Sequence, residues 1–254
     1  MSEFIVYGIP GSPFLRAALA TLEEKSALYR AEPMAPGEHR SEAYRAMNPF
    51  CRVPVVKHGD FVLYETQAIV RYIDDSVPGP ALQPAHPKAA ARMNQILGIN
   101  DWYVFPKVIA TVVFQRIVGP TIMGATADED ICAAAMPEAQ VCIDVLEGLL
   151  GESAYLAGDS FTLADLMLYP QLAYLSQTPE GRSLLTGRQL AAWLERMSVR
   201  PACSPPCRRN RSGRGLASAA SRSGACPSSC RPSRGASRRG RGGPRCPSGG
   251  PWRP

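Results

Sequence analysis

Residues 4–13 read FIVYGIPGSP, and this stretch decides how the chain begins to fold. It opens with a short apolar run of strand-forming residues that ends at Gly8. Ser12 and Pro13 then have the form of a helix start, because serine is a good N-cap and proline at the first helical position gives up an N–H that would have no partner anyway. Apolar residues recur at helical spacing as far as Leu22. The stretch therefore predicts a strand followed by a helix.

Further strand and helix patterns complete one domain within residues 1–78. Residues 27–33 can form a second strand, whereas residues 36–49 are polar and irregular. Two short apolar runs, 53–56 and 61–64, are joined by a turn and indicate a hairpin. A helix pattern then runs from residue 65 to about residue 76. The order β-α-β and then β-β-α predicts an α+β domain.

The signals change at residues 79–87, a proline-rich linker. Beyond it the strand patterns stop, and residues 88–200 carry apolar side chains at helical spacing. One of these helix patterns is interrupted at Pro106, and residues 162–165 (TLAD) have the form of a capped helix start. The sequence thus predicts an all-helical second domain.

The overall net charge of +6 averages two very different segments. Residues 201–254 hold 12 arginines and no lysine or acidic residue, which leaves 16 basic and 22 acidic residues in the first 200 and a net charge of −6 there. No basic-then-apolar leader opens the chain, and no apolar run approaches the roughly 20 residues needed to span a bilayer. Three scattered cysteines in the first 200 residues do not suggest a disulfide framework. We expect a cytoplasmic protein with no membrane span.

Four motifs fall in order on the expected elements: VYGIPGSP at 6–13 followed by Arg16, NPFCRVPV at 48–55, LYETQAI at 63–69 and TLAD at 162–165. In this order they resemble the soluble glutathione transferases, and the resemblance covers residue 4 to about residue 200. It implies a thioredoxin-like N-terminal domain (βαβ-ββα) followed by an all-helical C-terminal domain, with the glutathione site in the first of them. The loop that ends at Pro13 is similar to the serine-type loop of the phi and theta classes.

Ser12 is the residue that this resemblance makes the thiol activator. The glutathione thiolate is the nucleophile, and a hydroxyl donor at a helix N-terminus stabilises an adjacent sulfur anion. Taken alone, Ser12 is better explained as a simple helix N-cap, and the other motifs reverse that preference. Tyr7 is the alternative activator, because many relatives use a tyrosine at the end of the first strand. The chain has no cysteine before Cys51, which argues against the cysteine-type relatives that reduce disulfides.

The resemblance places the middle of glutathione and its γ-glutamyl end on two further motifs. Val53 and Pro54 resemble the family's cis-proline step, where the Val53 backbone N–H and C=O pair with the cysteinyl part of glutathione; a strand-edge proline is the alternative interpretation. The Thr66 hydroxyl and backbone N–H are expected to receive the γ-glutamyl carboxylate, and Glu65 to meet the α-ammonium group. A capped helix with an acidic first turn describes the same pattern without a ligand.

Three side chains are candidates for contact with the glycine carboxylate of glutathione. His39 and Arg40 resemble the position of that contact in plant-type members, and a solvated loop histidine is the alternative for His39. Arg52 stands where relatives commonly carry glutamine or lysine, and its guanidinium group could meet the same carboxylate.

The resemblance also implies the second substrate and the assembly. A small electrophile is expected between Phe14 and Leu15 of the first domain and the first helices of the second, near Tyr103 and Phe105, although aromatic residues at helical spacing are usually core. Glutathione is the co-substrate, with no other cofactor and no metal. A homodimer is expected, in which the first domain of one chain meets the helical domain of the other.

The composition changes abruptly at residue 201, after which 12 Arg, 10 Ser, 9 Gly and 9 Pro fill most of residues 201–254. Such a segment cannot bury enough apolar surface to offset its conformational entropy, which predicts a disordered tail. Its cysteine pairs, Cys203-x3-Cys207 and Cys226-x3-Cys230, depart from the usual C-x2-C zinc knuckle, so no zinc site is expected. A frameshift near codon 201 in G/C-rich DNA is the hypothesis that accounts for this composition.

Three functions remain for the whole chain. The first is an enzyme that conjugates glutathione to small hydrophobic electrophiles, the second a non-catalytic transferase-like binding module, and the third a nucleic-acid-binding protein acting through its basic tail. Ser12 together with Glu65 and Thr66 favours the enzyme over the binding module. The abrupt change in composition disfavours the third, so neither nucleic acid nor membrane is expected as a partner.

Overall fold

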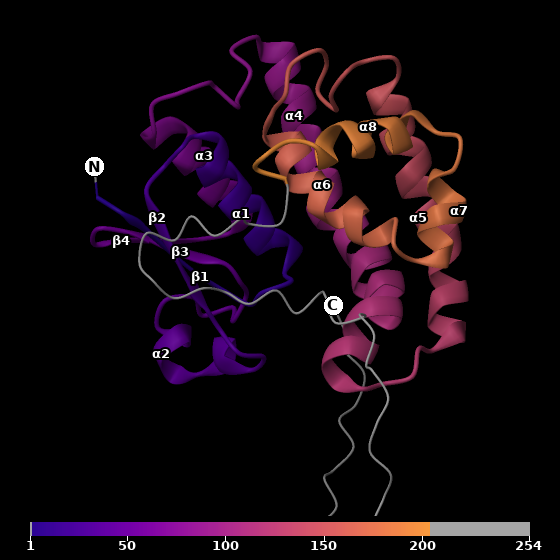
Figure 1. The fold of residues 1–254 in the computed structure, drawn as a ribbon, viewed down its shortest axis with the longest axis horizontal. Coiled ribbons are helices and arrows are strands. Elements are labelled where there is room, and N and C mark those ends of the chain that lie inside the picture. The colour runs from indigo at the N-terminus through magenta and orange to yellow at the C-terminus, as the bar shows by residue number, and fades with distance from the viewer. Residues whose placement is uncertain (1, 204–254) are drawn as a thin grey trace, which may run out of the picture. The chain divides into compact units, whose positions relative to one another are not determined.

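The computed structural model, which describes residues 2–203, begins with a four-stranded sheet flanked by helices (Figure 1). The strands β1 (Phe4–Gly8), β2 (Tyr29–Pro33), β3 (Val55–His58) and β4 (Phe61–Tyr64) stand in the order β2-β1-β3-β4. β1 is parallel to β2 and antiparallel to β3, and β3 is antiparallel to β4. A parallel pair needs a crossover, which helix α1 (Pro13–Glu24) supplies. The predicted βαβ-ββα order of a thioredoxin-like domain is confirmed.

One face of this sheet packs against α1 and α3 (Thr66–Ser76). Side chains alternate along β1, so that Phe4 and Val6 are buried against these helices while Ile5 and Tyr7 are only half-buried. The apolar period of β1 therefore fixes which side of the sheet carries α1, and with it the side on which Ser12 lies.

Residues 36–49, expected to be irregular, contain two short helices. A single 3₁₀ turn spans Glu38–Arg40, and α2 spans Glu42–Arg45. Ser41 caps α2 by accepting a hydrogen bond from the Tyr44 backbone N–H at 3.3 Å. The expectation was wrong because a four-residue helix is too short to show an apolar period, and the Ser41 cap is its main sequence signal.

Beyond Pro87 the regular structure of the described residues is helical, apart from one bridge between Tyr155 and Gly158. The helices are α4 (Pro87–Ile99), the wider-wound η2 (Asn100–Met123), α5 (Glu129–Leu150), α6 (Leu163–Leu175), α7 (Pro179–Leu185) and α8 (Gln189–Ser198). This arrangement confirms the expected fold class, a thioredoxin-like domain followed by an all-helical one.

Helix α4 continues into η2 through Pro106, where the sequence predicted an interruption. A proline inside a helix removes one backbone donor and normally kinks it. Here Val104, Val108 and Val112 are fully buried within the core that η2 shares with α5 and α6. The interruption was wrongly predicted because packing of this apolar face outweighs the lost hydrogen bond, and the wider winding accommodates the proline.

The continuous helix Pro87–Met123 is long and apolar enough, by length and composition alone, to cross a membrane. Its most apolar window has a mean hydropathy of 1.3, and 44% of that window is buried inside the structure. The core helix of a globular protein passes the same test, and this helix packs against α5 and α6. The sequence prediction considered unbroken apolar runs, whereas this helix carries Asp101, Lys107 and Arg116 among its apolar residues.

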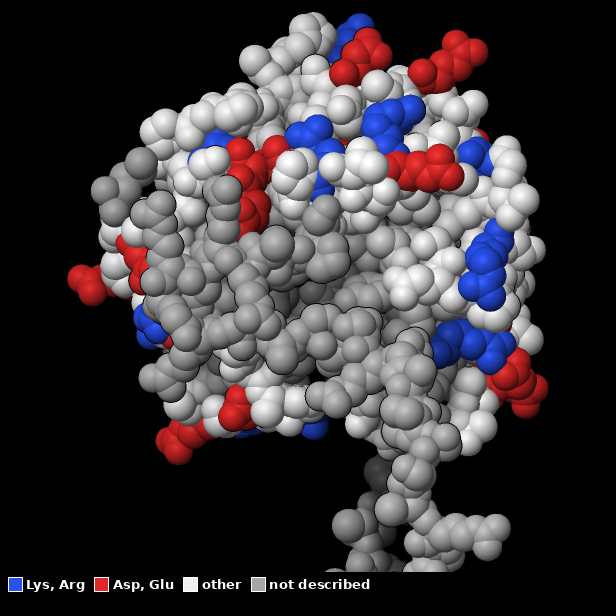
Figure 2. All heavy atoms as spheres, in the orientation of Figure 1, with Lys and Arg blue, Asp and Glu red and all other residues white. Residues whose placement is uncertain are grey.

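Charged side chains of both signs lie interspersed around the face drawn in Figure 2. This mixture agrees with the 16 basic and 22 acidic residues counted in the first 200. The coloured part of that face shows no large patch of one sign.

The described chain ends in a turn, Pro201–Cys203, that lies beyond the predicted end of the helical domain. The Cys203 side chain is 1% exposed, and burial raises the pKa of its thiol to about 12, which does not suit a metal-binding thiolate. The predicted tail thus contributes at least three residues to the described structure. The expectations of disorder and of a frameshift, and the disfavoured zinc site at Cys207, Cys226 and Cys230, fall on residues outside it.

Candidate active site

Ser12 lies at the N-terminus of α1, in the tight loop that follows β1. Gly8 packs so closely on α1 that a Cβ there would lie 2.8 Å from Leu15 Cδ1, and Gly11 has a φ of 94°, which favours glycine. Ser12 itself has an extended backbone, and its Oγ accepts a hydrogen bond from the Leu15 backbone N–H at 3.3 Å. Since that bond uses only a lone pair of Oγ, the hydroxyl proton is free to be donated to a ligand.

Tyr7, the alternative activator, lies on the sheet face turned away from α1. Its alternation with the buried Val6 directs its side chain to that side of β1. The Lys57 Nζ atom lies 5.7 Å from the centroid of the Tyr7 ring, which is a cation–π distance. The loop geometry therefore favours Ser12 for a ligand bound at the N-terminus of α1.

The peptide bond between Val53 and Pro54 is cis. Val53 precedes the β3 ladder, which begins at Val55, and its backbone N–H and C=O make no hydrogen bond within the described residues. Both groups are thus available to an extended peptide-like ligand, as the resemblance to glutathione transferases implies.

The second helix N-terminus predicted for the ligand belongs to α3, which begins at Thr66. Glu65, just before it, has a φ of 69° and a ψ of 112°, which is an unusual conformation for a residue with a side chain. Glu65 is exposed and its carboxylate caps nothing, whereas Thr66 is buried. Strained backbone of this kind is typical of ligand-binding positions, because folding alone does not favour it.

His39, Arg40 and Arg52 lie near one another on the α2 side of the domain. Burial lowers the pKa of His39, and the charges of Arg40 and Arg52 lower it further. The Nδ1 atom of His39 is buried and has no hydrogen-bond partner in the described residues. A cluster of this kind is suited to an anion, which would satisfy the imidazole and offset the repulsion between the cations.

The structure adds supporting residues that sequence reasoning missed. The Tyr44 hydroxyl and the Asn48 side-chain amide donate to the Arg52 backbone carbonyl at 2.8 and 2.9 Å and so hold the segment before the cis bond. Gln67 Nε2 donates to Asp101 Oδ2 at 2.7 Å, which ties the first turn of α3 to the helical domain. The sequence indicated only a turn at Asn48-Pro49. Nothing in the local pattern showed that Tyr44 and Asn48 bind the Arg52 carbonyl, and the Gln67–Asp101 contact joins segments 34 residues apart.

Taken together, these groups can hold an extended ligand that carries a thiol in its middle and an anion at each end. The α1 and α3 N-termini and the cluster at His39 supply the polar and cationic groups. Within residues 2–203, no group of three or more His, Cys, Asp or Glu side chains is placed to hold a metal ion.

Comparison with known proteins agrees with this arrangement. The model of the glutathione S-transferase N-terminal domain matches residues 6–81, and that of the glutathione S-transferase C-terminal domain matches residues 133–196. A glutathione S-transferase from Hyoscyamus muticus is 33% identical over 204 residues, which cover 78% of this chain and 95% of the relative. The chain belongs to the glutathione S-transferase family.

Other members of the family are similar at the same level. Glutathione S-transferase F7 from Arabidopsis thaliana is 32% identical over 205 residues, covering 79% of this chain and 97% of the relative. The crystal structure of glutathione transferase F7 from Populus trichocarpa matches with a TM-score of 0.71 and 32% identity, covering 79% of this chain and 95% of that one. The predicted family, fold and transferase activity are confirmed, and no finding supports the binding-module or nucleic-acid alternatives.

In this glutathione S-transferase, two of the four residues predicted for the electrophile site meet between the domains. The ring centroids of Phe14 of α1 and Phe105 of η2 lie 4.8 Å apart. Leu15 is instead buried in the core of the first domain, because each helical residue turns about 100° from the last and carries Leu15 away from the side of Phe14. Tyr103 is 57% exposed and lies outside the Phe14–Phe105 contact.

Tyr174 on α6 is a residue near the Ser12 loop that the sequence did not indicate. Its hydroxyl lies 3.8 Å from the position that a Cβ on Gly11 would take, one residue before Ser12. No described residue forms a hydrogen bond with this hydroxyl. Tyr174 is recognised only from the fold, because 162 residues separate it from Ser12.

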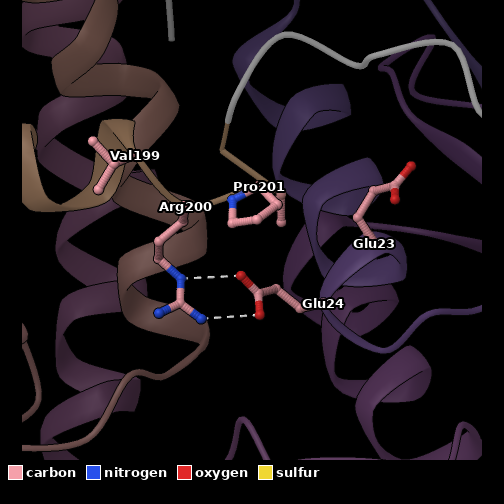
Figure 3. Close-up of a pocket in the computed structure, with 6 residues that line it drawn as sticks. Glu23, Glu24, Val199, Arg200 and Pro201 are labelled. Atoms are coloured by element: carbon pink, nitrogen blue, oxygen red, sulfur yellow. Dashed lines mark hydrogen bonds and ion pairs between the residues drawn. The ribbon is translucent and has the colours of Figure 1, made fainter.

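Two hollows of the surface lie away from this site. One is lined by Glu23, Glu24 and residues 199–202, at the end of α1 opposite Ser12 (Figure 3). The other lies between η2 and α5, where Lys107 and Glu138 form an ion pair at 3.0 Å. Neither hollow contains any of the residues predicted to bind glutathione.

Proposed function

We propose that Ser12 of this transferase activates the thiol of glutathione for conjugation to small hydrophobic electrophiles. The supporting observation is that Ser12 Oγ caps α1 by accepting from Leu15, which leaves its proton available at the positive end of the helix. The helix-terminus effect is worth about 0.3–1 kcal/mol when exposed and up to ~2 kcal/mol when partly buried. With ~1.4 kcal/mol per pKa unit, the helix and the hydroxyl together lower the thiol pKa by about one or two units.

The reaction then needs little from the protein beyond positioning and charge stabilisation. The thiol gives its proton to solvent, and Ser12 Oγ donates a hydrogen bond to the resulting thiolate. The sulfur attacks an electrophilic carbon and forms a C–S bond; with an aryl halide, the C–halogen bond breaks and the halide leaves with its electron pair. Phe14 and Phe105 offer an apolar surface for the electrophile at the domain boundary. Such chemistry suits a role in detoxification.

The remaining predicted residues position glutathione. We assign the γ-glutamyl carboxylate to the N-terminus of α3 at Thr66 and the α-ammonium group to Glu65. The cysteinyl main chain pairs with Val53, whose backbone groups have no other partner in the described residues. We assign the glycine carboxylate to His39, Arg40 and Arg52, because the buried His39 Nδ1 atom has no partner in the described residues and the charges of both arginines act on the imidazole.

The proposal includes a cytoplasmic homodimer, as expected from the sequence. Large apolar side chains are exposed on both domains: Phe50 is 66% exposed on the first, and Trp102 is 77% exposed on the second. Burying them against a second copy would remove apolar surface from water. Light scattering at micromolar concentration is expected to give twice the chain mass, and a monomer mass would contradict the dimer.

Retention of the full chain on immobilised glutathione, followed by a chlorodinitrobenzene assay, tests the proposed function. We expect specific elution by free glutathione and measurable turnover. Protein with the circular dichroism of a folded α+β chain that neither binds nor turns over would overturn the proposal.

A further inference from the structure

Three segments that are far apart in the sequence meet at Arg16, one turn into α1. Its guanidinium group donates a hydrogen bond to the backbone carbonyl of Cys203, in the last described turn. Helix α1 packs against α6, and the Arg16 charge lowers the pKa of the Tyr169 and Tyr174 hydroxyls of α6 against the stronger effect of burial. Arg16 therefore joins the catalytic helix, the helical domain and the C-terminal turn.

The same C-terminal segment also holds the other end of α1. Arg200 Nε and Nη2 each donate to a carboxylate oxygen of Glu24 at 3.0 Å (Figure 3). The Arg200 guanidinium carbon also lies 3.7 Å from the centroid of the Phe161 ring. Cys203 is 1% exposed, so the turn is packed and not merely adjacent. Residues 200–203 thus contact α1 at its last residue and in its first turn.

Arg16 is also coupled directly to Ser12. Its backbone N–H donates to the Ser12 carbonyl at 3.0 Å, and residues four apart lie on the same side of a helix. A shift of the first turn would move the Ser12 hydroxyl with it. Misplacing a reacting group by about 1 Å can cost about 10²-fold in rate, so an anchor at this point affects the chemistry even though it does not touch the substrate.

We propose that Arg16 is a positioning residue, which fixes the first turn of α1, and hence the Ser12 hydroxyl, by binding the main-chain carbonyl of residue 203. This inference rests on the proposed role of Ser12. Because the acceptor is a main-chain carbonyl, any residue at position 203 supplies it. The anchor therefore does not depend on the unusual composition that begins at residue 201.

The test uses full-length Arg16→Gln and Arg16→Lys, with Arg196→Gln as the matched control. Arg196 also donates to a main-chain carbonyl, that of Ala154 at 2.7 Å, but it belongs to α8, and within residues 2–203 no hydrogen bond or ion pair joins it to α1. The readouts are kcat/KM with chlorodinitrobenzene as a function of pH, and the ultraviolet absorbance of the thiolate of bound glutathione. A merely structural role would change stability without moving the pKa of the bound thiol.

For Arg16→Gln we expect a loss of about 10- to 100-fold in kcat/KM and a higher pKa of the bound thiol. Arg16→Lys keeps the charge and one donor and is expected to lie between this variant and the wild type. Arg196→Gln is expected to match the wild type in both readouts. If the pKa of the bound thiol is the same in the Arg16 variants as in the wild type, the proposal is overturned. If Arg16→Gln does not fold, the same comparison is made with Arg16→Lys alone.

A Ser12→Ala background separates this inference from the proposed function. If Arg16 acts through Ser12, Arg16→Gln should leave the bound-thiol pKa of the Ser12→Ala protein unchanged. A further shift in that background would mean that Arg16 acts independently, which contradicts the inference. If Ser12→Ala alone has wild-type activity, the proposed function is what fails.

Discussion

Ser12 caps α1 and is the thiol activator that we propose, so Ser12→Ala removes both functions together and a control must separate them. Ser12→Ala is expected to lower kcat by about 10²–10³-fold, as for the loss of one anion-hole donor, with a much smaller change in glutathione affinity. Loss of the N-cap should also cost about 1 kcal/mol of unfolding free energy. Thr178→Ala removes the cap of α7, where Thr178 Oγ1 accepts from the Gly181 N–H at 2.9 Å, and should lower stability without lowering kcat. If Tyr7→Phe causes the large loss and Ser12→Ala does not, the thiol activator is Tyr7.

Binding of the glycine carboxylate should be coupled to proton uptake by the His39 imidazole. Its pKa in the free protein is lowered by burial and by Arg40 and Arg52, so the ring is neutral at neutral pH. A carboxylate bound beside it would raise that pKa, so glutathione affinity should increase as the pH falls through the bound-state pKa and level off below the free-state value. Each unit by which the His39 pKa differs between the bound and the free protein changes the Kd of glutathione by up to about tenfold. Calorimetry in two buffers should detect proton uptake in the wild type and none in His39→Asn; equal uptake in both would place the carboxylate elsewhere.

At the level of elements, the start of α6 carries a buried network that stabilises the helical domain. Asp165 is fully buried and accepts hydrogen bonds from Leu156 N–H at 3.0 Å, from Thr162 N–H at 2.9 Å and from Trp193 Nε1–H at 2.9 Å. Asp165→Ala leaves these three donors buried without partners, at about 1–3 kcal/mol each, so we expect the free energy of unfolding in urea to fall by at least about 3 kcal/mol.

Asp128 provides the matched comparison, because it caps α5 through the backbone N–H groups of Asp130 and Ile131 but lies exposed. Asp128→Ala should cost only about 1 kcal/mol. Equal losses for the two variants would mean that burial of the Asp165 network is not what stabilises the domain.

Elements with a clear apolar period could be predicted from the sequence, and in α1 and α6 a side-chain cap also marked the first residue. The structure places β1, α1 and α6 as expected. α2 has only a cap within four residues, and the proline in η2 pointed to a break that packing overrides. A local sequence pattern indicates only the intrinsic preference of a segment for helix or strand. Whether the helix continues through Pro106 depends on packing against residues that are distant in the sequence.

At the scale of the whole molecule, the contacts that could not be predicted are those between segments distant in the sequence. The predicted glutathione-binding side chains occur in local motifs, so their positions on loops and helix ends followed from the sequence. The contacts of Gln67 with Asp101, of Tyr174 with the Gly11 loop and of Arg16 with residue 203 join segments separated by tens of residues or more. One sequence without an alignment carries no record of such pairs.

Two truncated proteins, one ending at Arg200 and one ending at Cys203, show whether residues 201–203 are needed for activity. A chain ending at Cys203 keeps the carbonyl that Arg16 binds, whereas one ending at Arg200 loses that acceptor and the buried Cys203 side chain. Both truncations remove the same 12 arginines, so net charge and non-specific binding to nucleic acid change equally. We expect residues 1–203 to keep turnover within about twofold of the full chain, and residues 1–200 to retain glutathione binding but lose about tenfold or more in kcat with a lower Tm. Turnover and thermal unfolding are measured for both truncated proteins and for the full chain. If both truncated proteins match the full chain, the C-terminal turn is dispensable and Arg16 needs no anchor. If both are inactive, residues beyond 203 contribute to the site.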